Sequence, residues 1–314
     1  MKEQEDFRTY LKKYKKKSRT HFRGHEGISF YLSIEPLRQL QEFGVLTEKE
    51  VQNCLTIISM HGSLFDNIDA DGEMKKASKV FDKFNDVDLF GAFVTQVKCD
   101  SLGRFFTSKD GRKNNAERLG TEIFTQQQFL DYKEEQAAKV LNEPLTACHY
   151  PWINVLIGAP GSGKSTYIDK LMNLDTDFVT ISRDESLMDY AKLNDIEGNY
   201  SEVWKQLTDD DQKEVDKLLE VTFRKAVKYK QNLIVDMTNM SNKAQRKWTN
   251  KVNAPKSYRA VATVFATSYS ELQRRLDTRE KETGKAIPDF VIKNMMKGFM
   301  VPNFTNFSKI SWVF

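Results

Sequence analysis

The clearest chemical motif in the sequence is a glycine-rich octapeptide that ends in lysine and serine. Residues 158–165 read GAPGSGKS and fit the pattern GxxxxGK[ST] of a phosphate-binding loop. An apolar run at 152–159 leads into the motif, and a helix-prone segment follows it. In such a loop the backbone N–H groups surround phosphates, and the start of the next helix adds positive potential. The motif predicts a site for a nucleoside triphosphate.

The lysine and the serine of this motif have separate expected roles. Lys164 would reach the β- and γ-phosphates of ATP, and the Ser165 hydroxyl would bind Mg²⁺. A glycine-rich turn that binds no nucleotide is the alternative. The predicted nucleotide-binding residues are Gly158, Ala159, Pro160, Gly161, Ser162, Gly163, Lys164, Ser165 and Thr166.

Two aspartates end predicted strands, Asp184 after 178–181 and Asp236 in 233–236. The carboxyl ends of strands line the ligand crevice of an open α/β sheet, so both side chains should face the phosphate loop. Phosphoryl transfer needs a carboxylate to orient or deprotonate the attacking oxygen. One aspartate is expected to act as the base and the other to anchor Mg²⁺ or substrate. A helix N-cap is the alternative role for either.

Arginines cluster in a later helix-prone segment. Arg274, Arg275 and Arg279 precede Gly284 and Pro288, and arginine suits a planar hold on phosphate. A charged helix followed by glycine and proline predicts a lid hinge. A surface helix with ion pairs is the alternative.

The second half of the chain alternates short apolar runs with polar, helix-prone segments such as 214–230 and 271–281. This order is typical of an α/β fold, in which helices flank a parallel sheet on both faces. The predicted strands are 153–157, 178–181, 233–236, 260–265 and 310–314.

The first half shows helical periodicity without intervening strands, and we expect it to be all-α. The sequence 142–144, Asn-Glu-Pro, interrupts the last predicted helix, so the boundary should lie within 140–150. The predicted units are an all-α domain at 1–145 and an α/β domain at 146–314. The predicted helices are 31–43, 51–58, 76–84, 89–97 and 126–140.

The composition excludes several classes of protein. Hydrophobic residues make up 39% and charged residues 29%, which is typical of a globular chain. No apolar run approaches the roughly 20 residues that a bilayer span needs, and the N-terminus lacks the apolar segment of a secretory signal. We therefore expect a cytoplasmic protein with no membrane partner. The three cysteines, Cys54, Cys99 and Cys148, have no paired spacing, which argues against a disulfide framework or a zinc knuckle.

Basic side chains gather in two places. The stretch 237–270 has six basic residues and no acidic one, and lysines crowd positions 12–17. Either segment would attract a polyanion such as nucleic acid. A solvated helix face and a frayed chain start are the alternatives.

Taken in order, these motifs resemble the kinase domain of polynucleotide 5′-kinases from bacteriophages and their bacterial relatives. The resemblance spans about residues 152–302 and implies a P-loop kinase that phosphorylates 5′-hydroxyl ends of RNA or DNA with ATP and Mg²⁺. It implies that Asp184 is the general base, that Asp236 lies beside the acceptor, and that Arg279 is the lid arginine. The predicted acceptor-binding residues are Arg183, Thr238, Asn239 and Arg275. The motifs that carry the resemblance are 158–165, 182–184, 236–239, 271–279 and 284–288.

One position departs from that family. Three residues after the base, where the phage enzymes have an acceptor-binding arginine, this chain has Leu187. Arg183 or the basic stretch 243–259 would have to replace that contact. Two other functions stay open: a P-loop kinase for a sugar or nucleoside, and a non-catalytic subunit that binds ATP or RNA.

The first half has a likeness of its own. Segments 22–26, 60–62 and 97–104 resemble parts of HD-type metal phosphohydrolases, which precede this kinase in bacterial enzymes that heal RNA ends. The resemblance implies that His25, His61 and Asp100 hold a divalent transition metal. No His-Asp dipeptide occurs in the chain, however. Either another, upstream polypeptide completes a split domain, or the domain is a decayed 2′,3′-phosphatase kept for packing or RNA binding. A histidine in a core is the plainer role for His61.

Overall fold

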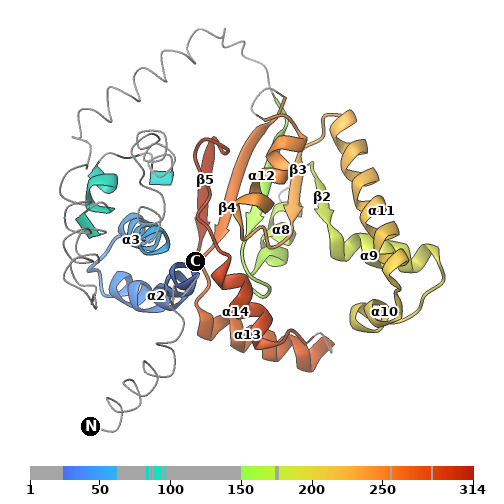
Figure 1. Ribbon diagram of the computed structural model, residues 1–314, viewed down its shortest axis with the longest axis horizontal. Helices are drawn as coiled ribbons and strands as arrows, with labels where there is room; N and C mark the ends of the chain where they lie inside the picture. The colour runs from blue at the N-terminus through green and yellow to red at the C-terminus, as the bar shows by residue number, and fades with distance from the viewer. Residues whose placement is uncertain are drawn as a thin grey trace, which may run out of the picture.

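The structure is a computed structural model, and it describes residues 24–61, 83–84, 86, 88–93, 95–96, 150–173, 177–254, 257–283 and 286–314. A parallel five-stranded sheet forms the centre of the second half, with the strand order β2-β3-β1-β4-β5 (Figure 1). The predicted α/β class is confirmed, and the predicted strand ends differ from the observed ones by at most one residue. The strands are β1 (Trp152–Ile157), β2 (Val179–Ser182), β3 (Leu233–Asp236), β4 (Arg259–Phe265) and β5 (Lys309–Val313).

Helices cover both faces of this sheet. On one face, Ile168 of α8 (Lys164–Met172) packs against Leu156 and Phe265. On the other face, α11 (Asp209–Lys228) and α12 (Asn242–Lys251) belong to the core that surrounds Ile153. This covering explains why β1 is apolar except at Asn154 and is buried from its second residue onward. The other helices of this half are α9 (Arg183–Leu193), α10 (Tyr200–Gln206), α13 (Tyr269–Thr283) and α14 (Asp289–Lys297).

The described part of the first half is helical, as predicted. It contains α2 (His25–Glu42) and α3 (Glu48–Met60), and the described residues within 88–96 are helical too. A capping box between Thr47 and Glu50 starts α3. The predicted helix at 126–140, the lysines at 12–17 and nearly all of the predicted boundary lie outside the described residues. No helix in the described ranges is long and apolar enough to cross a membrane.

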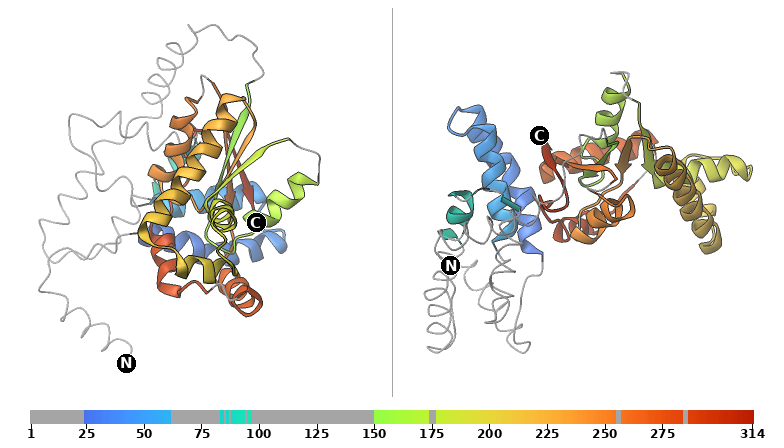
Figure 2. Two further views of the ribbon diagram at one scale, coloured as in Figure 1. Left: turned by 90° about the vertical axis from the view of Figure 1, so that its right-hand side faces the viewer. Right: turned by 90° about the horizontal axis from the view of Figure 1, so that it is seen from above.

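Helix α2 lies against the β5 edge of the sheet, whereas α9, α10 and α11 lie at the β2 edge (Figures 1 and 2). The ring of Phe30 is 4.3 Å from that of Phe299 and 6.0 Å from that of Trp312, measured between centroids. Phe30 and Tyr31 of α2 belong to the same apolar core as Ile153 of β1. The front helices therefore share a core with the α/β half.

A glycine sets the distance between α2 and α14. A Cβ atom on Gly27 would lie 2.0 Å from the carbonyl oxygen of Met296, so the two helices would have to move apart. We expect Gly27→Ala to lower the free energy of unfolding by about 1–3 kcal/mol, measured by urea denaturation. Gly91→Ala is the matched control, because no atom of the described residues lies within 4 Å of its added Cβ. Equal losses in the two variants would contradict the close contact.

Candidate active site

The phosphate loop, residues 158–165, connects β1 to α8 as the motif requires. Gly163 caps the helix with a φ of 96°, and Gly161 has a φ of 79°. Both angles are left-handed and favour glycine, which explains these residues of the motif. The first turn of α8 has no acidic side chain, so its N–H groups and helix dipole are left to attract an anion.

Lys164 lies at the centre of the charges around this loop. Its Nζ atom donates hydrogen bonds to the carbonyl oxygens of Gly158, at 3.0 Å, and Ala159, at 2.9 Å. Burial lowers the pKa of Lys164 to about 8. The Asp236 carboxylate opposes this shift, the Arg279 guanidinium adds to it, and the Asp184 carboxylate opposes it. Four of the residues predicted to be catalytic therefore act on one another electrostatically.

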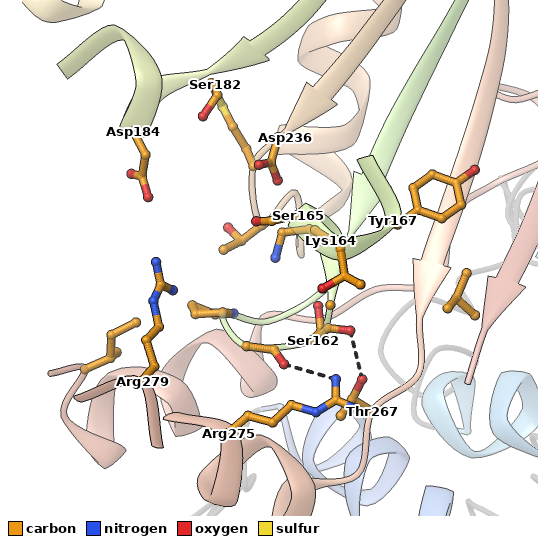
Figure 3. Close-up of a pocket in the computed structure, with 18 of the residues that line it drawn as sticks. Ser162, Lys164, Ser165, Tyr167, Ser182, Asp184, Asp236, Thr267, Arg275 and Arg279 are labelled. Atoms are coloured by element: carbon orange, nitrogen blue, oxygen red, sulfur yellow. Dashed lines mark hydrogen bonds between the residues drawn. The ribbon is translucent and has the colours of Figure 1, made fainter. Parts of the chain in front are cut away.

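These four residues line one cavity of about 1020 Å³ beside the phosphate loop. Figure 3 shows Asp184 and Arg279 pointing toward one another across this cavity. Ser165 and Thr166 line it as well, next to Lys164. The cavity thus combines hydroxyls, cations and carboxylates, the groups that phosphoryl transfer requires.

Neighbouring strands hold the two carboxylates. In the register of β2 with β3, Ser182 is the partner of Asp236. The Ser182 side chain then caps α9 by accepting a hydrogen bond from the Glu185 N–H at 3.4 Å, so Asp184 lies in the first turn of this helix. The Tyr200 hydroxyl donates to Asp184 Oδ1 at 2.8 Å. Asp184 is therefore oriented by its helix and by a tyrosine from α10.

The three arginines of α13 have different surroundings. Arg274 forms a surface ion pair with Glu271, at 2.7 Å. Arg275 also contacts Glu271 at 2.7 Å and donates to the carbonyl oxygen of Gly161 at 3.3 Å, so it supports the phosphate loop. Hydrogen bonds from Arg274 and Arg275 lower the pKa of Glu271 to about 2. Arg279 extends into the cavity. The ion-pair interpretation thus applies to Arg274, whereas the lid hinge stays a prediction, because 284–285 lie outside the described residues.

The structure corrects part of the predicted acceptor contacts. The Asn239 side chain is buried and donates to the carbonyl oxygen of Leu156 at 2.9 Å, which ties the segment after β3 to β1 instead of reaching the cavity. Arg183 lines the cavity, but it donates to Asp216 at 2.8 Å and to Gln212 at 2.6 Å, both on α11. Thr238 lines the cavity as expected.

The basic stretch does not supply the missing contact. Its described basic residues, which exclude Lys256, are absent from the lining of this cavity. Lys251 instead forms an ion pair with Glu220. Leu187, the residue three positions after Asp184, is fully buried beside Ala191. Among the described residues, the basic stretch therefore contributes no cation to this cavity.

The residues present fit a magnesium ion. Ser165 offers an exposed hydroxyl on the first turn of α8, and Asp236 lines the same cavity. Mg²⁺ is usually bound by one or two protein oxygens together with phosphates and water. Within the described ranges, no group of three or more His, Cys, Asp or Glu side chains forms a metal cage. A site shared between the protein and the nucleotide needs no such cage.

In the front half, two of the three predicted metal ligands come together. The Nε2 atoms of His25 and His61 are 2.9 Å apart, and His61 Nδ1 is 2.6 Å from the carbonyl oxygen of Ile58. Asp100, the third predicted ligand, lies outside the described residues. The transition-metal site therefore stays a prediction.

The sequence interpretation missed two contributors to the site. Tyr200 contacts Asp184, and its only signal in the sequence was the capping box of Asn199 and Glu202 that starts α10. Thr267 donates to the carbonyl oxygen of Ser162 at 3.2 Å from 105 residues away. No local pattern marks such a residue.

Comparisons with known proteins agree with this architecture. Residues 153–302 match a family model described as an AAA domain. A chain in the structure of the Pnkp1/Rnl/Hen1 RNA repair complex is 25% identical over 49% of this chain and 45% of that chain, with a TM-score of 0.40. A chain in a structure of the Pnkp1/Rnl/Hen1 complex is 23% identical over 42% and 41%, with a TM-score of 0.34. The protein thus spans less than half the length of these chains. The parallel sheet, the phosphate loop and the family match give its second half a P-loop kinase-like fold.

Proposed function

We propose that this chain transfers the γ-phosphoryl group of ATP to the 5′-hydroxyl end of a polynucleotide. The observation that supports this most directly is the orientation of Asp184, whose carboxylate points into the cavity beside the phosphate loop, opposite Arg279 (Figure 3). A carboxylate so oriented can take a proton from an incoming hydroxyl.

In this proposal, Asp184 accepts the proton of the 5′-hydroxyl while the hydroxyl oxygen attacks the γ-phosphorus. The bond between the γ-phosphorus and the β,γ-bridging oxygen breaks, and ADP leaves with that oxygen. Lys164 and Arg279 neutralise negative charge on the transferred group, and the loop N–H groups hold the β-phosphate. Mg²⁺, when bound, would neutralise further phosphate charge, and Ser165 and Asp236 are the residues that would hold it.

The polynucleotide acceptor is supported by the ordered set of motifs, from the phosphate loop through 182–184 and 236–239 to Arg279. The phosphate loop and the carboxylates alone would suit any hydroxyl acceptor.

A transfer assay with γ-labelled ATP and Mg²⁺ tests the proposal. We expect label on RNA or DNA oligonucleotides that carry a 5′-hydroxyl, and none on matched oligonucleotides that already carry a 5′-phosphate. Transfer to a nucleoside or a sugar, with unlabelled oligonucleotide, would favour a small-molecule kinase. ATP binding without transfer to any acceptor would favour a non-catalytic subunit.

A further inference from the structure

Two aromatic side chains on α10 lie beside the proposed base. Tyr200 and Trp204 are four residues apart and therefore lie on one side of the helix. Their rings are nearly parallel, with an angle of 19° and centroids 6.2 Å apart. Tyr200 also lines the cavity and contacts Asp184. An aromatic surface thus begins at the carboxylate and continues outward along α10.

This aromatic pair is held in a defined position. Val203, between the two rings in sequence, is fully buried with Leu187 and Val215, which anchors α10 on α9 and α11. The guanidinium carbon of Arg183 is 5.3 Å from the centre of the Trp204 ring, and Arg183 is itself bound to α11. Yet Trp204 remains 44% exposed. A large ring fixed at the surface, beside the tyrosine that contacts the proposed base, is suited to binding a flat ligand.

Three other positions considered for the acceptor do not serve this purpose, although Thr238 lines the cavity. Leu187 is buried in the core, the Arg183 guanidinium is bound to Asp216 and Gln212, and Asn239 is turned into the fold. An acceptor whose hydroxyl meets Asp184 has Tyr200 as an immediate neighbour. Stacking on aromatic rings holds single-stranded nucleic acid without regard to sequence.

We propose that Tyr200 and Trp204 form a stacking surface for the first bases at the 5′ end of the acceptor strand. This inference rests on the proposed function and narrows it to acceptors that carry a nucleobase close to the reacting hydroxyl.

The test combines a protein change with an acceptor change. The acceptors are a 5′-hydroxyl oligonucleotide and the same oligonucleotide with its first two nucleotides abasic. For the wild type, we expect kcat/KM for the acceptor to fall about 10-fold when the bases are removed. We expect kcat/KM of Trp204→Ala to be about 10-fold lower than that of the wild type on the intact acceptor. On the abasic acceptor, kcat/KM of this variant should decrease little further. The KM for ATP should not change.

Two further variants serve as controls for Trp204→Ala. Trp204→Phe keeps a ring and should recover most of the activity, and Tyr229→Ala, which removes a 64% exposed tyrosine from the far end of α11, should match the wild type. Wild-type activity in Trp204→Ala would overturn the inference while leaving the kinase proposal intact. So would a full further loss of kcat/KM in Trp204→Ala when the bases are removed, because the two changes would then act independently. If the wild type transfers no phosphate to oligonucleotides, quenching of Trp204 fluorescence by the oligonucleotide, compared with Trp204→Phe, still decides whether the rings bind bases.

Discussion

Replacing Asp184 with asparagine is expected to reduce phosphoryl transfer by about 10²- to 10⁴-fold, the contribution typical of a positioned general base. Asparagine has nearly the same shape and can still accept the hydrogen bond from Tyr200, but it cannot accept the proton of the acceptor hydroxyl. ATP binding should be retained, because Asp184 lies on α9 and is not part of the phosphate loop that is expected to hold the triphosphate. Rates of label transfer and a separate measurement of ATP affinity check the two halves of this expectation.

Asp189→Asn is the matched control for that variant. Asp189 lies on the same helix, α9, is exposed, and pairs only loosely with Lys192 at 3.9 Å. This variant removes the same charge from the same helix outside the cavity, so it should transfer phosphate at the wild-type rate. If Asp184→Asn were as active as Asp189→Asn, Asp184 would not be the base.

Lys164→Ala is expected to lower kcat/KM for ATP by about 10²- to 10³-fold, which is the usual loss when one preorganised donor to a developing charge is removed. Its ammonium is the cation of the phosphate loop itself, and Arg275, which contacts this loop, is already bound to Glu271 and to the carbonyl oxygen of Gly161. Lys164→Arg should recover little, because the fork of a guanidinium does not fit where a compact ammonium does. Steady-state kinetics with ATP as the varied substrate measures both variants.

The pKa of Lys164 adds a pH dependence that the alanine variant should lose. Burial lowers this pKa to about 8, so the ammonium is charged below pH 8 and becomes neutral as the pH rises through that value. Triphosphate binds the charged form, and ATP affinity in the wild type should therefore decrease above about pH 8. Affinity that stays constant from pH 7 to pH 9.5, or an identical decrease in Lys164→Ala, would contradict this role.

The elements and residues that the sequence predicted well are those with a local signature. The strands were found because both sheet faces are covered, which makes the strands mostly apolar, as in β1. The phosphate loop carries its geometry in its own glycines. Asp184 and Asp236 were placed beside it because parallel strands end at one edge, and the register of β2 with β3 bears this out.

Residues whose role depends on distant partners were harder to predict. Asn239 lies within a promising motif, yet its amide is needed by the backbone of β1, a contact that sequence spacing does not reveal. Arg183 follows the same strand as Asp184, but its direction is set by Asp216 on α11. Tyr200 reaches Asp184 only because α10 packs back on α9, and no short motif encodes that return.

The packing of α2 has an evolutionary consequence. Tyr31 is buried beneath the phosphate loop, where its hydroxyl donates to Met240 Sδ at 3.5 Å and is hydrogen-bonded to the backbone of Ala159. Glu35, one turn further along, accepts a hydrogen bond from Ser270, next to the start of α13. The phosphate loop is therefore supported by a helix more than a hundred positions upstream. A gene fusion that replaced one half of the chain without the other would have to restore these contacts between α2 and the α/β half. We therefore expect the two halves to be inherited together.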